Sequence, residues 1–137
     1  MRIFFIGFGQ AGGKIVDMFL EQDRKLGRNS FRAIAVNTAR TDLMGLKHIE
    51  LKDRILIGQT VVKGHGVGTD NAAGARITMD EVDSIVSAID RKGTHDVDAF
   101  MVVAGLGGGT GSGGTPVLVR QLKNIYHEPV YVLGILP

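Results

Sequence analysis

The sequence predicts an α/β protein in which parallel strands form a doubly wound, Rossmann-like sheet with helices on both faces. Strand-like and helix-like segments alternate along all 137 residues. Several strand-like segments are almost continuously apolar, which is typical of parallel strands buried on both faces. Glycine-rich segments lie between these elements and lack the low complexity of a flexible linker. We find no internal repeat and no domain boundary, so the chain is interpreted as one domain with one core.

Five segments are expected to form the strands, and these are residues 2–6, 31–36, 54–57, 98–104 and 130–135. Helices are expected at residues 10–26, in a short stretch within 37–46, from about residue 78 to Gly93, and at 115–126. Thr78 and Glu81 have the spacing of a capping box, which would start the third of these helices at Thr78. Residues 58–76 are expected to form a loop. The last strand is expected to be buried, and a chain that stops directly after it, at Pro137, is interpreted as a fragment.

Composition excludes several classes of function. The chain has no cysteine, which excludes a disulfide framework, a thiolate metal site and a thiol nucleophile and favours a cytoplasmic location. No apolar stretch reaches the roughly 18 residues of a membrane span. The net charge is +2 and the basic residues are scattered, so nothing indicates a nucleic-acid partner. The four histidines are also scattered, without the spacing of metal ligands.

Glycine placement predicts an anion site. Sixteen of the 20 glycines lie in residues 7–13, 58–74 and 105–114. Two of these segments follow the first and the fourth strand. In the strand order 3-2-1-4-5 these two strands are neighbours, and ligands bind at their carboxyl ends, where the winding reverses. A strand that turns through glycine into a helix offers free N–H groups and a positive dipole end to a phosphate.

Two common nucleotide motifs fit less well. Residues 7–12 match G-x-G-x-x-G, which leaves open an NAD(P)- or FAD-binding Rossmann domain of an oxidoreductase. That fingerprint also needs an acid near the end of the second strand, where the sequence has Val36, Asn37 and Thr38. The P-loop motif of kinases and ATPases fails because Ile15 follows Lys14, where a serine or threonine is required.

A third motif is more specific. Residues 107–113 read Gly-Gly-Gly-Thr-Gly-Ser-Gly, which resembles the signature loop of the tubulin/FtsZ superfamily of polymerising GTPases. Three further segments resemble the other phosphate loops of that superfamily in the same order, namely residues 9–12, 35–38 and 66–71. The pair formed by residues 10–14 (Gln-Ala-Gly-Gly-Lys) and 68–71 (Gly-Thr-Asp-Asn) is most similar to the archaeal tubulin-like CetZ group. This resemblance implies a fold of the tubulin/FtsZ GTPase-domain type.

The resemblance also implies the site. GTP or GDP would lie across the first and fourth strands, with a water-bridged Mg²⁺ ion. Asn37 and Asp70 would lie near the ribose or the phosphate–magnesium end, whereas no residue stands out as catalytic or as a metal ligand. The implied nucleotide-binding residues are Gln10, Ala11, Gly12, Gly13, Lys14, Asn37, Gly68, Thr69, Asp70, Gly107, Gly108, Gly109, Thr110, Gly111 and Ser112.

By the same resemblance, residues 1–137 would be the N-terminal part of the GTP-binding domain, without the central helix and the C-terminal domain. The longer protein would assemble head to tail into a homopolymer and complete its GTPase site at the subunit interface, so this part alone would be inactive. Such filaments would serve cell shape or division. A module that binds nucleotide and assembles without hydrolysis is a further alternative.

Overall fold

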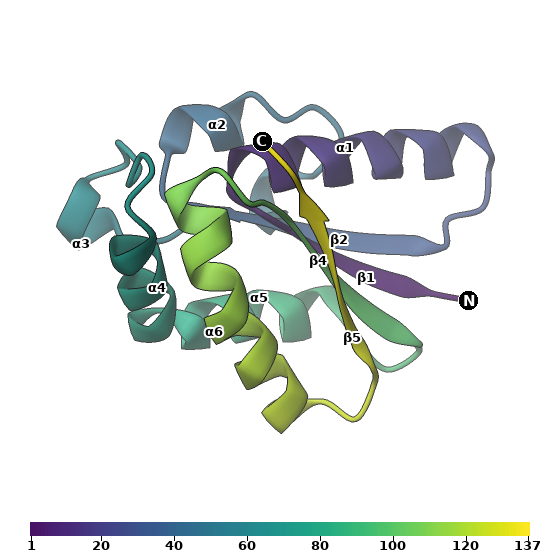
Figure 1. Ribbon diagram of the computed structural model, residues 1–137. Helices are drawn as coiled ribbons and strands as arrows, with labels where there is room; N and C mark the ends of the chain where they lie inside the picture. The colour runs from purple at the N-terminus through teal and green to yellow at the C-terminus, as the bar shows by residue number, and fades with distance from the viewer.

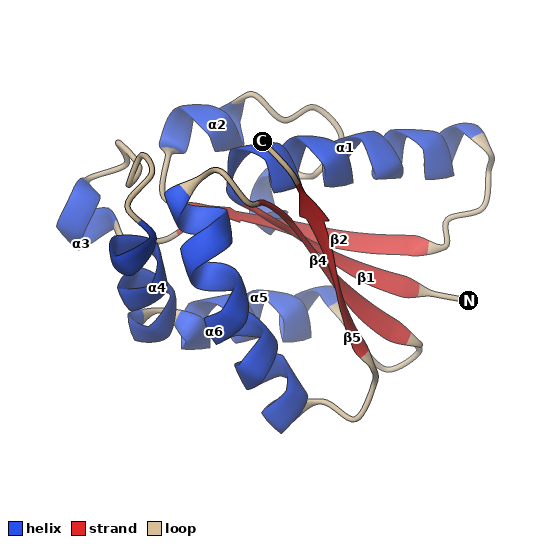
Figure 2. Cartoon of the chain, in the orientation of Figure 1, coloured by secondary structure: helices blue, strands red, loops and turns tan.

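The computed structural model describes residues 1–137 and shows a five-stranded, fully parallel sheet in the order β3-β2-β1-β4-β5 (Figures 1 and 2). The strands are β1 (Ile3–Phe8), β2 (Phe31–Asn37), β3 (Arg54–Leu56), β4 (Ala99–Gly105) and β5 (Val130–Ile135). The helices are α1 (Gly9–Lys25), α2 (Arg40–Met44), α3 (Gln59–Val62), α4 (Asn71–Asp80), α5 (Val82–Lys92) and α6 (Gly109–Ile125), with a 3₁₀ turn, η1, at Leu51–Asp53. The predicted doubly wound α/β class and its strand order are confirmed.

Alternate side chains of the central strands feed two separate cores. On one face Phe4, Ile6 and Phe8 of β1 pack with residues of α4, α5 and α6. On the other face Phe5 packs against α1 and α2. Helices therefore cover both faces, with α1 and α2 on one side and α4, α5 and α6 on the other (Figure 1). This double burial explains why β1 and β4 are nearly continuously apolar in sequence.

The winding reverses between β1 and β4. These two strands pair in parallel, with Phe8 opposite Ala104 at their carboxyl ends. The chain leaves β1 into α1 on one face and leaves β4 into α6 on the other. The starts of α1 and α6 consequently meet at one edge of the sheet, which is where a doubly wound sheet binds its ligand.

The predicted capping box at Thr78 is wrong. Thr78 lies inside α4, and its hydroxyl donates to the carbonyl oxygen of Gly74 over 2.8 Å. The N-cap of α4 is Asp70, whose carboxylate accepts from the backbone N–H of Ala73 at 3.0 Å. Glu81 lies at the junction of α4 and α5, where its carboxylate accepts from the N–H of Gly58. Residues 58–76 are also not a single loop, since they contain α3 and the first part of α4.

The helix α6 begins six residues earlier than predicted, at Gly109 instead of 115, and includes most of the glycine run. Glycine is a poor helix former, so this helix depends on tertiary contacts. A Cβ atom on Gly113 would lie 2.1 Å from the carbonyl oxygen of Asn71, and one on Gly74 would lie 2.1 Å from that of Gly109. The glycines thus allow α4 and α6 to pack backbone against backbone.

The surface differs from expectation at β5. This strand pairs only with β4, and its side chains are largely exposed, with Tyr131 55%, Val132 49% and Leu133 40% accessible. The expectation of a buried final strand is wrong for this structure.

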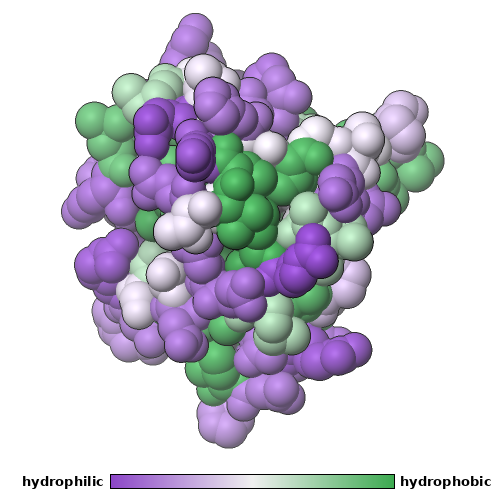
Figure 3. All heavy atoms as spheres, turned by 90° about the vertical axis from the view of Figure 1, so that its left-hand side faces the viewer, coloured by the Kyte–Doolittle hydropathy of each residue, from purple (hydrophilic) through white to green (hydrophobic).

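Seen from the side of α3 and α4, hydrophilic residues surround a group of apolar residues near the middle of the face (Figure 3). None of the helices has the length and apolar character required to traverse a bilayer.

Candidate functional site

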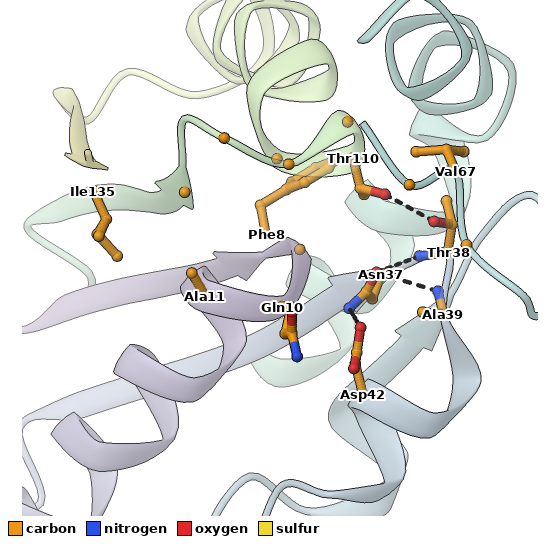
Figure 4. Close-up of a pocket in the computed structure, with 18 of the residues that line it drawn as sticks. Phe8, Gln10, Ala11, Asn37, Thr38, Ala39, Asp42, Val67, Thr110 and Ile135 are labelled. Atoms are coloured by element: carbon orange, nitrogen blue, oxygen red, sulfur yellow. Dashed lines mark hydrogen bonds between the residues drawn. The ribbon is translucent and has the colours of Figure 1, made fainter. Parts of the chain in front are cut away.

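A cavity of about 370 Å³ opens at the carboxyl ends of the central strands. Its walls come from the starts of α1 and α6, the segment after β2 and the segment before α4 (Figure 4). Nine of the fifteen predicted residues line it, and these are Gln10, Ala11, Asn37, Gly68, Gly107, Gly108, Gly109, Thr110 and Gly111. The structure therefore brings together segments that the sequence places up to about a hundred residues apart.

The glycine-rich turn before α6 presents its backbone to the cavity. The N–H groups of Gly107 and Gly108 donate to no other backbone group, whereas that of Gly109 donates to the carbonyl oxygen of Gly68 at 2.9 Å. No atom lies within 4 Å of the position that a Cβ on Gly108 would take, so the space before this residue is open. Open donors at the positive end of a 17-residue helix are suited to an anion.

The start of α1 meets the start of α6. Gly9 has a φ of +80°, and a Cβ atom there would lie 3.2 Å from the backbone nitrogen of Gly111. Glycine at this position permits both the left-handed turn out of β1 and the close approach of the two helix ends. Two dipole ends therefore point into the same cavity, beside Gln10 and Ala11 (Figure 4).

Three predicted residues of α1 lie outside the cavity. A Cβ atom on Gly12 would lie 2.0 Å from the carbonyl oxygen of Val103, so this glycine lets α1 pack directly on β4. Gly13 faces Leu46, and Lys14 is exposed on the helix surface. These three residues directly follow Gln10 and Ala11 in sequence, so a contiguous motif included them although they lie one turn into the helix.

Asn37 shapes the segment after β2. Its Oδ1 atom accepts from the N–H groups of Thr38 at 2.8 Å and Ala39 at 3.2 Å, and its Nδ2 donates to Asp42 over 3.4 Å (Figure 4). Most of its hydrogen-bonding capacity is thereby used within the protein. Asp42, which sequence reasoning missed, is the one carboxylate that lines the cavity. It was not predicted because it lies on α2, five residues after Asn37, and not at the end of the strand.

Residues 64–70 are tied to two neighbouring segments. Gly64 accepts from the N–H of Arg40 at 2.9 Å, and His65 forms an isolated antiparallel bridge with Ala39. Of the three residues predicted around the start of α4, only Gly68 lines the cavity. Thr69 and Asp70 lie just outside it, with Asp70 acting as the N-cap of α4.

Ser112 is also outside the cavity lining. Its hydroxyl donates to the Oδ1 atom of Asn71 at 2.8 Å instead of facing the open space. Thr110 does line the cavity, and its hydroxyl is 2.7 Å from that of Thr38. The remaining residues of the lining, which were not among the fifteen predicted nucleotide-binding residues, are Phe8, Gly9, Thr38, Ala39, His65, Gly66, Val67, Gly105, Ile135, Leu136 and Pro137.

The cavity contains no lysine or arginine. Asp42 and His65 are its only ionisable side chains, so any anion would meet peptide N–H groups and helix dipoles rather than cationic side chains. Nor does the structure contain a cluster of three or more histidine, aspartate or glutamate side chains that could hold a metal ion. The arrangement is suited to binding an anion and contains no pair of side chains with the geometry of a nucleophile and its base.

Comparison with known proteins agrees with this geometry. Residues 2–137 match the family model described as the GTPase domain of the Tubulin/FtsZ family. The chain belongs to the Tubulin/FtsZ family. Within this family it is 59% identical over 138 residues to tubulin-like protein CetZ1 of Haloferax volcanii, covering all of this chain and 35% of that protein. The predicted similarity to the CetZ group is confirmed.

Solved structures of this family match the whole chain. A GDP-bound monomer of CetZ1 from Haloferax volcanii gives a TM-score of 0.97 at 59% identity, with 42% of that chain covered. A GTPγS-bound protofilament of CetZ2 from the same organism gives a TM-score of 0.94 at 47% identity, with 40% of that chain covered. The tubulin/FtsZ type of the fold is thereby confirmed, and the chain spans about a third of the length of the curated relatives it matches.

Proposed function

We propose that residues 1–137 are the phosphate-binding, N-terminal part of the GTP-binding domain of a CetZ-like GTPase. The observation that carries this proposal is the meeting of two glycine-lined helix starts, α1 and α6, at the β1–β4 reversal. The solved relatives with the same fold are a GDP-bound monomer and a GTPγS-bound protofilament, which supports a guanine nucleotide.

Within this site the roles divide by position. The N–H groups of Gly107 and Gly108 and the open ends of α1 and α6 would hold the phosphates. Gln10, Asn37 and Thr110 would add side-chain contacts from the cavity wall. Gly12, Gly13, Lys14, Thr69, Asp70 and Ser112 would act indirectly, since they lie behind the lining.

A Mg²⁺ ion would be held mainly by the phosphates and water. Mg²⁺ prefers octahedral oxygen ligands and commonly binds through substrate phosphates with one or two carboxylates. Asp42 is the carboxylate best placed to be such a ligand, because it lines the cavity and Asn37 orients it. Asp42 is the one carboxylate of the lining, so the phosphates and water would supply the other ligands, and the ion would neutralise part of the phosphate charge when bound.

The longer protein would hydrolyse GTP at an interface between subunits that stack head to tail. The protofilament described for CetZ2 supports this assembly. The absence of a nucleophile–base pair around this cavity supports a site completed by another subunit. By analogy with the family, such filaments would act in the cytoplasm in the control of cell shape, and the isolated 137-residue chain would not hydrolyse GTP.

The oxidoreductase alternative is not favoured. Asp42 does supply an acid near the end of β2, which a dinucleotide-binding domain would use for the ribose. The match of residues 2–137 to the Tubulin/FtsZ family decides against that alternative.

Replacing Gly108 with leucine tests the site. Gly108 has an extended backbone, with φ −96° and ψ 154°, and open space at its Cβ position, so the side chain would enter the cavity without disturbing the fold. Calorimetry with GTP, GDP and NADH should show guanine nucleotide binding to the unchanged protein and none to Gly108→Leu. Gly45→Leu is a matched control, since Gly45 lies outside the cavity with a φ of −78°. Equal GTP affinity in both variants, or tight binding of NADH alone, would contradict the proposal.

A further inference from the structure

We infer that Ser112 and Asn71 are positioning residues that fasten the segment 66–70 to the start of α6 and do not themselves contact the nucleotide. The inference rests on the proposed function, because it assigns roles within that same site. It differs from the role that the sequence resemblance implied for Ser112, which was that of a nucleotide-binding residue.

The geometry shows a link between two helix starts. The hydroxyl of Ser112, in the first turn of α6, donates to Oδ1 of Asn71, the first residue of α4, at 2.8 Å. The two residues are 41 positions apart in sequence. Neither is among the residues that line the cavity. Their hydrogen bond therefore joins the two helices just behind the cavity wall.

Backbone packing fixes the distance that this hydrogen bond spans. A Cβ atom on Gly113 would lie 2.1 Å from the carbonyl oxygen of Asn71, so α6 touches the backbone of α4 at the residue that accepts the bond. One turn further along, Gly74 is equally close to Gly109. With both helices held in contact, the side chains of Asn71 and Ser112 stay within hydrogen-bonding reach of each other at the protein surface.

The same link positions the segment before α4. Asp70 caps α4 by accepting from Ala73, and Gly68 accepts from the N–H of Gly109. Gly68 lines the cavity, and residues 66–68 lie on the side of the segment that follows β2. Gly68 adjoins the start of α6, whereas Gly66 lies beside Ala39 after β2, so a long phosphate tail would follow more of this segment than a short one. The link thus holds in place the part of the wall along which a long tail would extend.

Hydrogen-bond chemistry separates this role from direct binding. A serine hydroxyl has one proton to donate, and ionised phosphate oxygens only accept. While Ser112 donates to Asn71 it has no proton left for a phosphate. Direct contact between Ser112 and a phosphate would require this bond to break. If this part of the wall is already in position, ligand binding does not have to overcome the free-energy cost of ordering it.

A double-mutant cycle tests the inference. Affinities for GTPγS and for GMP are measured by calorimetry on the protein, on Ser112→Ala, on Asn71→Ala and on the double variant, with circular dichroism to confirm folding. A single hydrogen bond corresponds to roughly a fivefold change in an equilibrium constant. We expect each single variant to lose about fivefold in GTPγS affinity, the double variant to lose no more than either, and GMP affinity to change less than twofold. Ser112→Thr, which keeps the hydroxyl, should restore GTPγS affinity.

The outcomes distinguish this inference from the proposed function. If the unchanged protein binds no GTPγS, the proposed function itself fails. If it binds, and Ser112→Ala weakens binding as strongly in the Asn71→Ala background as alone, Ser112 contacts the nucleotide and the inference is wrong. Equal losses for GMP and GTPγS, or no loss in either single variant, would overturn it as well.

Discussion

The hydroxyl oxygens of Thr38 and Thr110 lie 2.7 Å apart although 72 residues separate them in the sequence. Thr38 follows β2 and is fully buried, and Thr110 lies in the first turn of α6 and is 6% exposed. One hydrogen bond thus connects the segment shaped by Asn37 to the glycine-rich turn (Figure 4). Because both hydroxyls are buried, each depends on the other for a partner.

Replacing either threonine with valine should therefore destabilise the protein. Thr38→Val or Thr110→Val keeps the shape but leaves the remaining hydroxyl without this partner, which costs about 1–3 kcal/mol in the free energy of unfolding. The double variant should lose less than the sum of the two single ones, since no hydroxyl is left unpaired. Urea unfolding measures the three values, with Thr41→Val at an exposed position of α2 as the control. Strict additivity would show that the two hydroxyls do not interact.

Gly12→Ala tests the contact between α1 and β4. The added Cβ would lie 2.0 Å from the carbonyl oxygen of Val103, and two backbone segments must separate to admit it. We expect a loss of about 3 kcal/mol or more in the free energy of unfolding. Gly45→Ala, whose Cβ would be 3.6 Å from its nearest neighbour, should change stability by less than about 1 kcal/mol. Similar denaturation midpoints for the two variants would be incompatible with the observed packing of α1.

The buried carboxylate of Asp17 predicts a dependence of stability on pH. Burial raises its pKa, but hydrogen bonds from the N–H groups of Ile49, Lys47 and His48, together with the charge of His48, outweigh burial and lower the pKa below its usual value. A carboxyl group whose pKa is lower in the folded than in the unfolded protein stabilises the fold above about pH 4. That contribution is lost as the pH falls through the lowered pKa.

Asp17→Asn should accordingly destabilise the protein by about 2 kcal/mol at pH 7, since hydrogen bonds to a charged acceptor are replaced by weaker ones. The stability of this variant should also fall less steeply than that of the unchanged protein below about pH 4. Asp80→Asn, at an exposed position of α4, is the control. Thermal unfolding between pH 2 and 7 measures both effects. If stability depends on pH in the same way in all three proteins, Asp17 does not contribute to that dependence.

The proposed shared GTPase site predicts a particular concentration dependence. A protein that carries this chain within the full length of its relatives should release phosphate at a rate that rises more than linearly with its concentration, because two subunits form each site. The 137-residue chain should bind GTP and release no phosphate above background. Phosphate release measured over a hundredfold range of concentration checks both statements. A rate strictly proportional to concentration would rule out the shared site.

Much of the fold was predictable because it depends on local patterns. Apolar runs such as those around Phe4 and Phe100 identified the strands, and glycine density located the two segments, after β1 and β4, that line the cavity. Gly107 to Gly111, which line the cavity, were predictable because their motif is contiguous and lies at the end of a strand. The site residues found by sequence are mainly those with such neighbours.

The features that the sequence did not predict depend on contacts between distant segments. The start of α6 at Gly109 contradicts the low helix propensity of glycine, because packing against α4 overrides it. Thr78 resembled an N-cap, but α4 had already begun at Asn71. Asp42 entered the cavity through its position on α2, and no spacing rule relates it to Asn37.

The lack of lysine and arginine around the cavity has a consequence for how substitutions affect it. Where backbone N–H groups supply the donors, binding depends on the path of the main chain and on the lack of a side chain at a few glycine positions. Exchanging one polar surface residue for another should leave such a receptor intact, whereas a single methyl group at the wrong glycine should abolish it.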